Sequence, residues 1–135
     1  MAGEIYKDKR GVIELLPLTP EESKQWGSKS KISSWQFAQR GLHWHRQDGH
    51  EVEVTKGTIE LYERPLYHDD QKPIKKILSV GDKAFTGPNI VHSFYSVTDS
   101  EFICLSLLPR DQKTYEEETV RVNYSLKDIY DSWVD

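Results

Sequence analysis

Short runs of four to nine residues, bounded by glycine, proline or charged clusters, make up the sequence from Ile32 to Pro109. In several of these runs apolar and polar residues alternate, which sends one set of side chains to each face of a strand. None of them has the periodicity of a helix. The pattern predicts a strand-rich, all-β domain. The predicted strands are 33–39, 41–46, 50–55, 58–63, 74–79, 83–86, 90–97 and 100–108.

Helices are predicted only near the two ends of the chain. Residues 19–22, Thr-Pro-Glu-Glu, offer an N-cap, a proline and a carboxylate in helix-starting order, so a short helix is expected as far as Trp26, before Gly27. Ser125 is a second candidate N-cap. Apolar residues follow it at helical intervals, which predicts a C-terminal helix packed on the strands. They are Leu126, Ile129, Tyr130 and Trp133.

The length and the charge of the chain narrow the class of protein. The 135 residues fit a single domain, 1–135, with its strand core at about 32–113. A net charge of −4 argues against a nucleic-acid partner, because phosphate binding needs a basic face. No apolar run approaches the roughly 20 residues that span a membrane, and the N-terminus lacks the apolar stretch of a signal peptide. We therefore expect a soluble, cytoplasmic protein without membrane contact.

Histidines are concentrated in one part of the pattern. His43 and His45 lie two apart in a predicted strand, so their side chains leave the same face with α-carbons about 6.5–7 Å apart. Two such imidazoles can meet one ion at about 2.0–2.1 Å. His50 starts the next strand, and it shares its face with Val52 and Val54, which are expected inside. All three histidines should therefore face the same interior.

The same residues resemble two motifs of the cupin superfamily. Gly41-Leu42-His43-Trp44-His45, then His50 and Gly57, is similar to the first motif, in which a glutamate normally stands where this chain has His50. The segment from Gly87 to His92 is similar to the second motif, although Gly87 and Asn89 replace its usual proline and glycine. The resemblance implies a double-stranded β-helix, or jelly-roll barrel.

The cupin resemblance also implies a metal site. The four positions that match the family's ligands hold four of the five histidines of the chain, and they imply a divalent transition metal such as Fe, Zn, Ni or Mn. An ion held only by neutral imidazoles keeps its full charge and is a strong Lewis acid. The implied metal ligands are His43, His45, His50 and His92.

A closer resemblance concerns the run from Arg40 to His45. Small cupins that isomerise or epimerise nucleotide-linked keto-sugars have a similar arginine, glycine and two histidines, and a similar glycine and proline before the later histidine. The resemblance implies a sugar or nucleotide-sugar as the small-molecule ligand, with His43 or His45 as acid–base groups. Arg40 would hold a phosphate or carboxylate of the substrate.

Three other interpretations stay open. An all-histidine site also resembles cupin dioxygenases with non-haem iron, because four ligands leave two octahedral positions for substrate and oxygen. A cupin that binds a sugar or small acid without chemistry is the second. The third is a cluster that holds no metal, in which the histidines are hydrogen-bonded barrel residues or acid–base groups that act without an ion.

Residues outside the histidine cluster carry more ordinary expectations. Trp35 and Phe37 are expected in the core, and Trp44 is expected to point outward to a dimer or sheet-packing surface. Cys104 should be an inert buried thiol, and the acidic run 115–118 a solvated face. Exposed strand edges and outward aromatics favour a homodimer.

Overall fold

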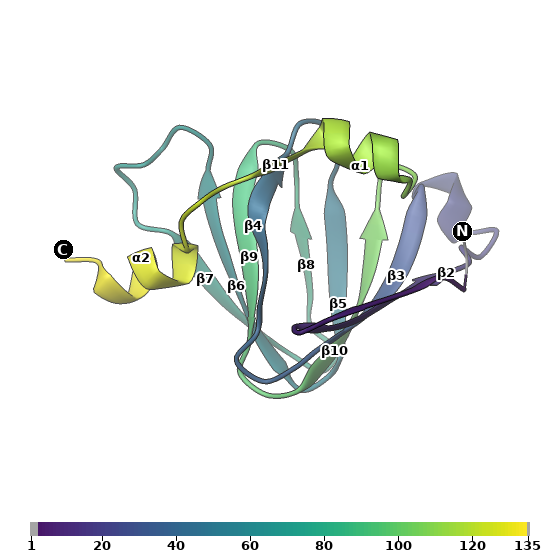
Figure 1. Ribbon diagram of the computed structural model, residues 1–135, viewed down its shortest axis with the longest axis horizontal. Coiled ribbons are helices and arrows are strands. Elements are labelled where there is room, and N and C mark those ends of the chain that lie inside the picture. Colours follow the sequence, from purple (N-terminus) through teal and green to yellow (C-terminus); the bar gives the residue numbers. More distant parts are fainter. Residues whose placement is uncertain (1–2, 135) are drawn as a thin grey trace.

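The computed structural model describes residues 3–134, and its strands form two antiparallel sheets that enclose a common interior (Figure 1). The elements in chain order are β1 (Ile5–Asp8), β2 (Gly11–Leu16), a 3-10 helix η1 (Glu22–Lys24), β3 (Ser28–Ser34), β4 (Gln39–His45), β5 (His50–Lys56), β6 (Thr58–Pro65), β7 (Ile74–Ser79), β8 (Lys83–Thr86), β9 (Ile90–Ser96), β10 (Ser100–Ser106), α1 (Gln112–Glu118), β11 (Thr119–Arg121) and α2 (Leu126–Ser132).

The order of strands in the two sheets is that of a jelly roll. One sheet has the order β1-β2-β3-β10-β5-β8, and the other has the order β11-β4-β9-β6-β7. From β3 to β6 the chain changes sheet at every turn, so neighbours within a sheet are mostly far apart in sequence. The predicted all-β barrel is confirmed, and its sheets extend beyond 32–113 to include β1, β2 and β11.

Alternation along the strands separates the core from the surface, as the sequence predicts. On β10, Phe102 and Cys104 are buried while Ile103 between them is not. On β5, Val52 and Val54 are buried on the same side as His50. The apolar cluster fills the interior beyond the histidines, because burying this surface supplies the main driving force for folding. Its buried members are Val52, Val54, Ile59, Leu61, Leu78, Phe102 and Cys104.

A second apolar cluster lies on the outer face of the five-stranded sheet. Helix α2 covers this face beside β6 and β9, and Figure 1 shows it in yellow at the edge of the barrel. The Ser125 side chain accepts a hydrogen bond from the Asp128 N–H, so the predicted cap and C-terminal helix are confirmed. Leu126 is fully buried here against Tyr62, and the outward-facing Trp44 packs on the same cluster. The chain thus covers Trp44 with its own C-terminal segment.

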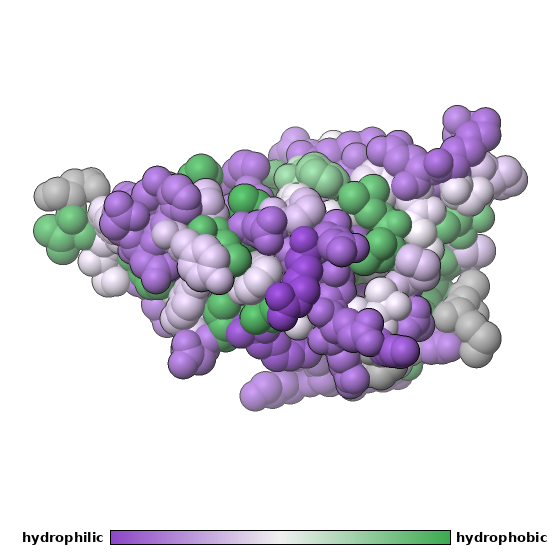
Figure 2. All heavy atoms as spheres, turned by 90° about the horizontal axis from the view of Figure 1, so that it is seen from above, coloured by the Kyte–Doolittle hydropathy of each residue, from purple (hydrophilic) through white to green (hydrophobic). Residues whose placement is uncertain are grey.

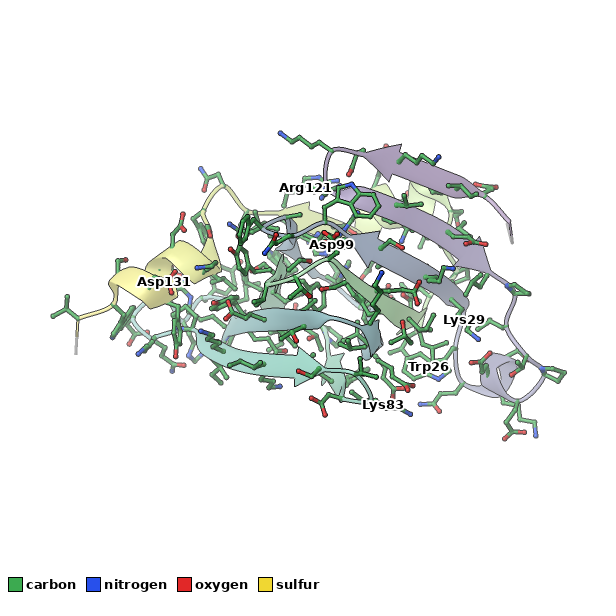
Figure 3. The ribbon with its side chains drawn as sticks, turned by 90° about the horizontal axis from the view of Figure 1, so that it is seen from below. Trp26, Lys29, Lys83, Asp99, Arg121 and Asp131 are labelled. Carbon is green, nitrogen blue, oxygen red and sulfur yellow. The ribbon has the colours of Figure 1, made fainter. Side chains whose placement is uncertain are left out.

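The predicted N-terminal helix is reduced to one 3-10 turn. Its capping box forms as expected: Thr19 Oγ1 accepts from the Glu22 N–H, and Glu22 Oε1 accepts from the Thr19 N–H. The helix stops early because Gly27 N–H already donates to the Ser106 carbonyl, where the chain enters β3. Trp26, labelled in Figure 3, tilts against the ring of Phe85 instead of extending the helix.

The expectation for Trp35 and Phe37 is wrong. Their exposed fractions are 45% and 67%, because the predicted strand 33–39 ends at Ser34 and a turn follows. Phe37 has φ of +70°, and the Gln36 N–H donates to the carboxylate of Asp99, which Figure 3 labels. Aromatic residues gave this segment the composition of a strand, and the left-handed residue within the turn reverses the chain.

The acidic run near the C-terminus is not wholly solvated. Helix α1 covers one end of the barrel, and its last residue, Glu118, is buried. The Glu118 carboxylate accepts hydrogen bonds from the backbone N–H groups of Gln47 and Asp48. It therefore fixes the turn between β4 and β5. His45 lies directly before this turn and His50 directly after it.

Exposed apolar side chains lie on edge strands of both sheets. Ile74 and Ile77 belong to β7, and Phe85 belongs to β8. Figure 2 shows that apolar residues on the face seen from above lie in separate patches among hydrophilic ones. The homodimer stays a prediction.

Over residues 3–134, none of the helices has the length and apolar character needed to cross a membrane.

Removing the Leu126 side chain tests the docking of α2. We expect Leu126→Ala to lower the free energy of unfolding by about 2–5 kcal/mol, because it leaves a cavity in a fully buried site. Val134→Ala is the control, since Val134 is 89% exposed and its truncation should change stability by less than about 0.5 kcal/mol. Urea denaturation followed by circular dichroism measures both, and equal effects would contradict the docking.

Candidate metal centre

Four histidines from both sheets meet inside the barrel. His43 and His45 come from β4, and His92 from β9 is the register partner of His43. His50 reaches them from β5 of the opposite sheet. The ring centroid of His43 lies 4.7 Å from the centroid of His45 and 4.7 Å from that of His92. The ring centroids of His45 and His50 are 4.5 Å apart. The structure thus brings together every histidine that the two motifs indicate.

A bulge in β4 sets the direction of the histidine pair. Gly41 has φ of +87° and Leu42 has φ of +59°, and the register with β9 shifts between Gly41 and His43. A Cβ at Gly41 would lie 2.9 Å from the His92 carbonyl oxygen, so only glycine allows the two strands to approach here. The close approach of β4 and β9 therefore explains why the motif has glycine at position 41.

Three of the four imidazoles are anchored through Nδ1. His92 Nδ1 donates to the Ile90 carbonyl at 3.1 Å, His50 Nδ1 pairs with Ser106 Oγ at 2.6 Å, and His45 Nδ1 pairs with Thr119 Oγ1 at 3.2 Å. Such contacts fix the ring and direct Nε2 into the interior. His43 differs, because its buried Nδ1 has no hydrogen-bond partner among the residues that the structure describes.

β11 supplies one of these anchors and was not predicted from the sequence. It pairs with β4, so that Thr119 lies opposite His45, and Arg121, labelled in Figure 3, lies opposite His43 in the register. Its three residues are too few to give a strand pattern. The edge of the histidine-bearing sheet is closed in this way by residues more than 70 positions away.

Burial keeps the imidazoles neutral. Desolvation, followed by the nearby His92, lowers the pKa of His45 to about 4. Burial is also the largest cause that lowers the pKa of His43 and of His50, and for both the neighbouring histidines add to it. In His92 burial again lowers the pKa, against an opposing hydrogen bond to the Ile90 carbonyl. Neutral imidazole is the form that binds transition metals.

The donor atoms form two overlapping groups that could hold an ion. Donor atoms of His43, His45 and His92 all lie within 4.8 Å of one another, and so do those of His45, Asp48 and His50. The first group is a set of three imidazoles, which suits Zn, Fe or Ni. The unpartnered His43 Nδ1 and the neutral rings fit such an ion. The residues present therefore fit a divalent transition metal.

Asp48 was not predicted from the sequence as part of the site. Its carboxylate accepts from the N–H groups of Gly49 and Leu108, and its Oδ2 lies 3.5 Å from His50 Nε2. Burial raises the pKa of Asp48. The residue sits in the turn before β5, where an aspartate followed by glycine reads simply as turn chemistry.

One cavity of about 110 Å³ joins the histidines to solvent. Its walls include all four histidines and Arg40, whereas His68, the fifth histidine, is exposed in the loop after β6. Cys104 is buried as predicted, and its Sγ lies 3.5 Å from His50 Nδ1. Burial raises the pKa of this thiol to about 11, so it stays protonated at neutral pH.

Comparison with known proteins rests on structure alone. No family model matches the chain, and neither does any curated protein. Its fold matches the Drosophila melanogaster CENP-C cupin domain with a TM-score of 0.60 at 10% identity, over 76% of this chain and 74% of that one. The chain has the cupin fold.

Two further matches with the cupin fold cover a larger share of this chain. CapF, a capsular polysaccharide assembling protein from Staphylococcus aureus, matches with a TM-score of 0.75 and 19% identity over 90% of this chain and 32% of that one. KdgF from Halomonas sp. matches with a TM-score of 0.63 and 18% identity over 82% of this chain and 90% of that one. The chain spans about a third of the length of CapF. At these identities the likeness concerns the fold.

The lowered histidine pKa values predict how stability depends on pH. An imidazole with a pKa near 6.5 when unfolded and about 4 when folded takes up a proton on unfolding between these values. Stability should therefore be complete above about pH 6.5 and fall toward pH 4, by up to about 1.4 kcal/mol per pH unit for each histidine.

Chemical denaturation of chelator-treated protein at several pH values measures this slope. We expect a shallower slope for His45→Gln, while His68→Gln, altered in the exposed loop, should keep the parent slope. Identical slopes for the parent and His45→Gln would show that His45 is not held neutral by burial.

Proposed function

We propose that this protein is a metal-binding cupin that acts as an isomerase or epimerase on a sugar or nucleotide-sugar. The observation that carries the proposal is that donor atoms of His43, His45 and His92 are mutually close, while His50 reaches the same cavity from the opposite sheet. A site of this kind can hold an ion and still offer a separate group for proton transfer.

His43, His45 and His92 are the proposed ligands. Their donor atoms are mutually close, and two of the three rings are oriented through Nδ1 by Thr119 and by the Ile90 carbonyl. A divalent ion held by these residues would supply a Lewis acid for a substrate carbonyl, which would make a neighbouring C–H more acidic. Three protein ligands are the number typical of catalytic zinc sites.

His50 is the proposed proton carrier. It lines the cavity, and its Nδ1 contact with Ser106 orients the ring. Its Nε2 lies 2.9 Å from Nε2 of His45; once His45 binds the ion, the His50 Nε2 takes a proton from the carbon next to the carbonyl and returns it to the substrate. The Asp48 carboxylate, 3.5 Å from Nε2, stabilises the imidazolium once it forms. The family resemblance gives acid–base work to His43 or His45, and we transfer it to His50 because an imidazole bound to an ion cannot take the proton.

The sugar substrate has separate support. The motif resemblance is to cupins that act on nucleotide-linked keto-sugars, and CapF, with which the fold is shared, is a capsular polysaccharide assembling protein. The cavity of about 110 Å³ is small beside the roughly 300 Å³ of ordinary ligand pockets, so the reacting end of a sugar enters it and the remainder stays outside.

Two variants separate the proposed roles of the histidines. We expect His92→Ala to lose the bound metal, measured by elemental analysis of protein purified without a histidine tag. His50→Gln should keep the metal but lose about 10²–10⁴-fold in the rate of hydrogen exchange next to the carbonyl of a keto-sugar, followed by NMR in deuterated water. His68→Ala is the control and should match the parent protein in both assays. Metal retained in full by His92→Ala contradicts the proposed site.

One contact favours a second candidate function. Nε2 of His45 and Nε2 of His50 are only 2.9 Å apart, which is close enough for both to bind one ion. Four imidazole ligands would leave two octahedral positions, as in a non-haem iron dioxygenase. Loss of metal in His50→Gln, together with oxygen consumption by the iron-loaded protein, would favour this function over the isomerase.

A further inference from the structure

Arg40 is a buried cation with few partners. Its exposed fraction is 6%, and its Nε has no hydrogen-bond partner among the residues that the structure describes. Nη2 lies 3.5 Å from the Ser33 carbonyl oxygen and 4.0 Å from Asp8 Oδ1, which are both distant for hydrogen bonds. A buried charge with such weak partners is costly for the folded protein. We therefore expect the Arg40 guanidinium to bind a partner that is not part of the chain.

Arg40 forms part of the wall of the histidine cavity. Arg40 lies on β4, three residues before His43, and both residues line the cavity. Its end reaches the opposite sheet, where a Cβ added to Gly11 of β2 would lie 1.9 Å from the Ser33 carbonyl oxygen and 3.1 Å from Nη2. Glycine at position 11 is required by the close approach to the Ser33 backbone, and it also leaves room for the guanidinium.

The lining of the cavity is cationic. Arg10 and Arg110 line it as well, and none of the described lining side chains is acidic, although the chain as a whole has a net charge of −4. Arg10 is paired with Asp8 through two of its guanidinium nitrogens. Arg40 is thus the buried cation of this wall with an unpartnered nitrogen. An anionic ligand would balance its charge.

The apolar wall of the cavity indicates which groups the ligand carries besides its anionic group. Ile13, Ile32, Phe94 and Phe102 line the same cavity. An inorganic anion would leave this apolar surface without contact, whereas an organic acid would cover it. The guanidinium fork matches the two oxygens of a carboxylate. We propose that the substrate of this site is a small carboxylic acid, such as an acid sugar, whose carboxylate pairs with Arg40 while its carbon skeleton reaches the histidines.

This proposal rests on the proposed function, because it takes the cavity as the substrate site, and it names the substrate class. Binding is measured by calorimetry in chelator-treated and in metal-loaded protein with two matched pairs, lactate against lactamide and glucuronate against glucose. We expect the acid of at least one pair to bind at least about tenfold more tightly than its neutral partner. Inorganic phosphate should bind more weakly than that acid.

Arg40→Met should abolish the preference for the acid, since it keeps the stem and removes the charge. The control is Arg46→Met, which removes the same charge from an exposed arginine outside the cavity and should keep the preference. Equal binding of both members of each pair up to about 10 mM overturns the proposal. So does tighter binding of phosphate, or an unchanged preference in Arg40→Met.

Thermal unfolding gives an independent readout that separates ligand binding from a structural role. Because Arg40 is buried without adequate partners, ligand-free Arg40→Met should have a Tm equal to or above that of the parent. A lower Tm would show that Arg40 stabilises the fold and would overturn the proposal. Selective acid binding without hydrogen exchange supports the carboxylate and refutes the isomerase, whereas exchange on neutral sugars without acid binding does the reverse.

Discussion

The burial of four imidazoles between two sheets is the constraint on which the rest of the structure depends. Neutral rings in an apolar barrel need partners for their nitrogens, and the chain supplies Ser106, Thr119 and the Ile90 carbonyl for three of them. The same burial lowers the histidine pKa values and so keeps the nitrogens available to a metal ion. Stability and binding chemistry thus have one physical origin.

Distant parts of the chain hold this cluster in place. Helix α1 ends in Glu118, which fixes the turn between the histidine-bearing strands β4 and β5. The next strand, β11, closes the edge beside β4 and brings Thr119 to His45. Gly41 allows β4 to approach β9 so that His43 faces His92. Each of these segments acts through one or two contacts, so no local sequence pattern marks its role.

The sequence predicts the fold and the histidine cluster because both depend on strand parity. His50 shares its face with Val52 and Val54, and this rule places it correctly across the barrel. Parity fails for Trp35 and Phe37, where a left-handed residue replaces the predicted strand by a turn. Contacts across the fold leave no local pattern at all. Tertiary packing alone brings Arg10 and Arg110 to the cavity and Glu118 to the turn before His50. Asp48 lies in that turn, where its sequence context indicates only a turn residue.

The position of a bound metal ion tests the central claim most directly. A crystal structure of metal-loaded protein, with anomalous diffraction at the absorption edge of the metal, locates the ion without reference to activity. The account predicts one ion at about 2.0–2.3 Å from one nitrogen each of His43, His45 and His92, with His50 outside the coordination sphere. An ion held by His45, Asp48 and His50, or protein that takes up no ion, would contradict it.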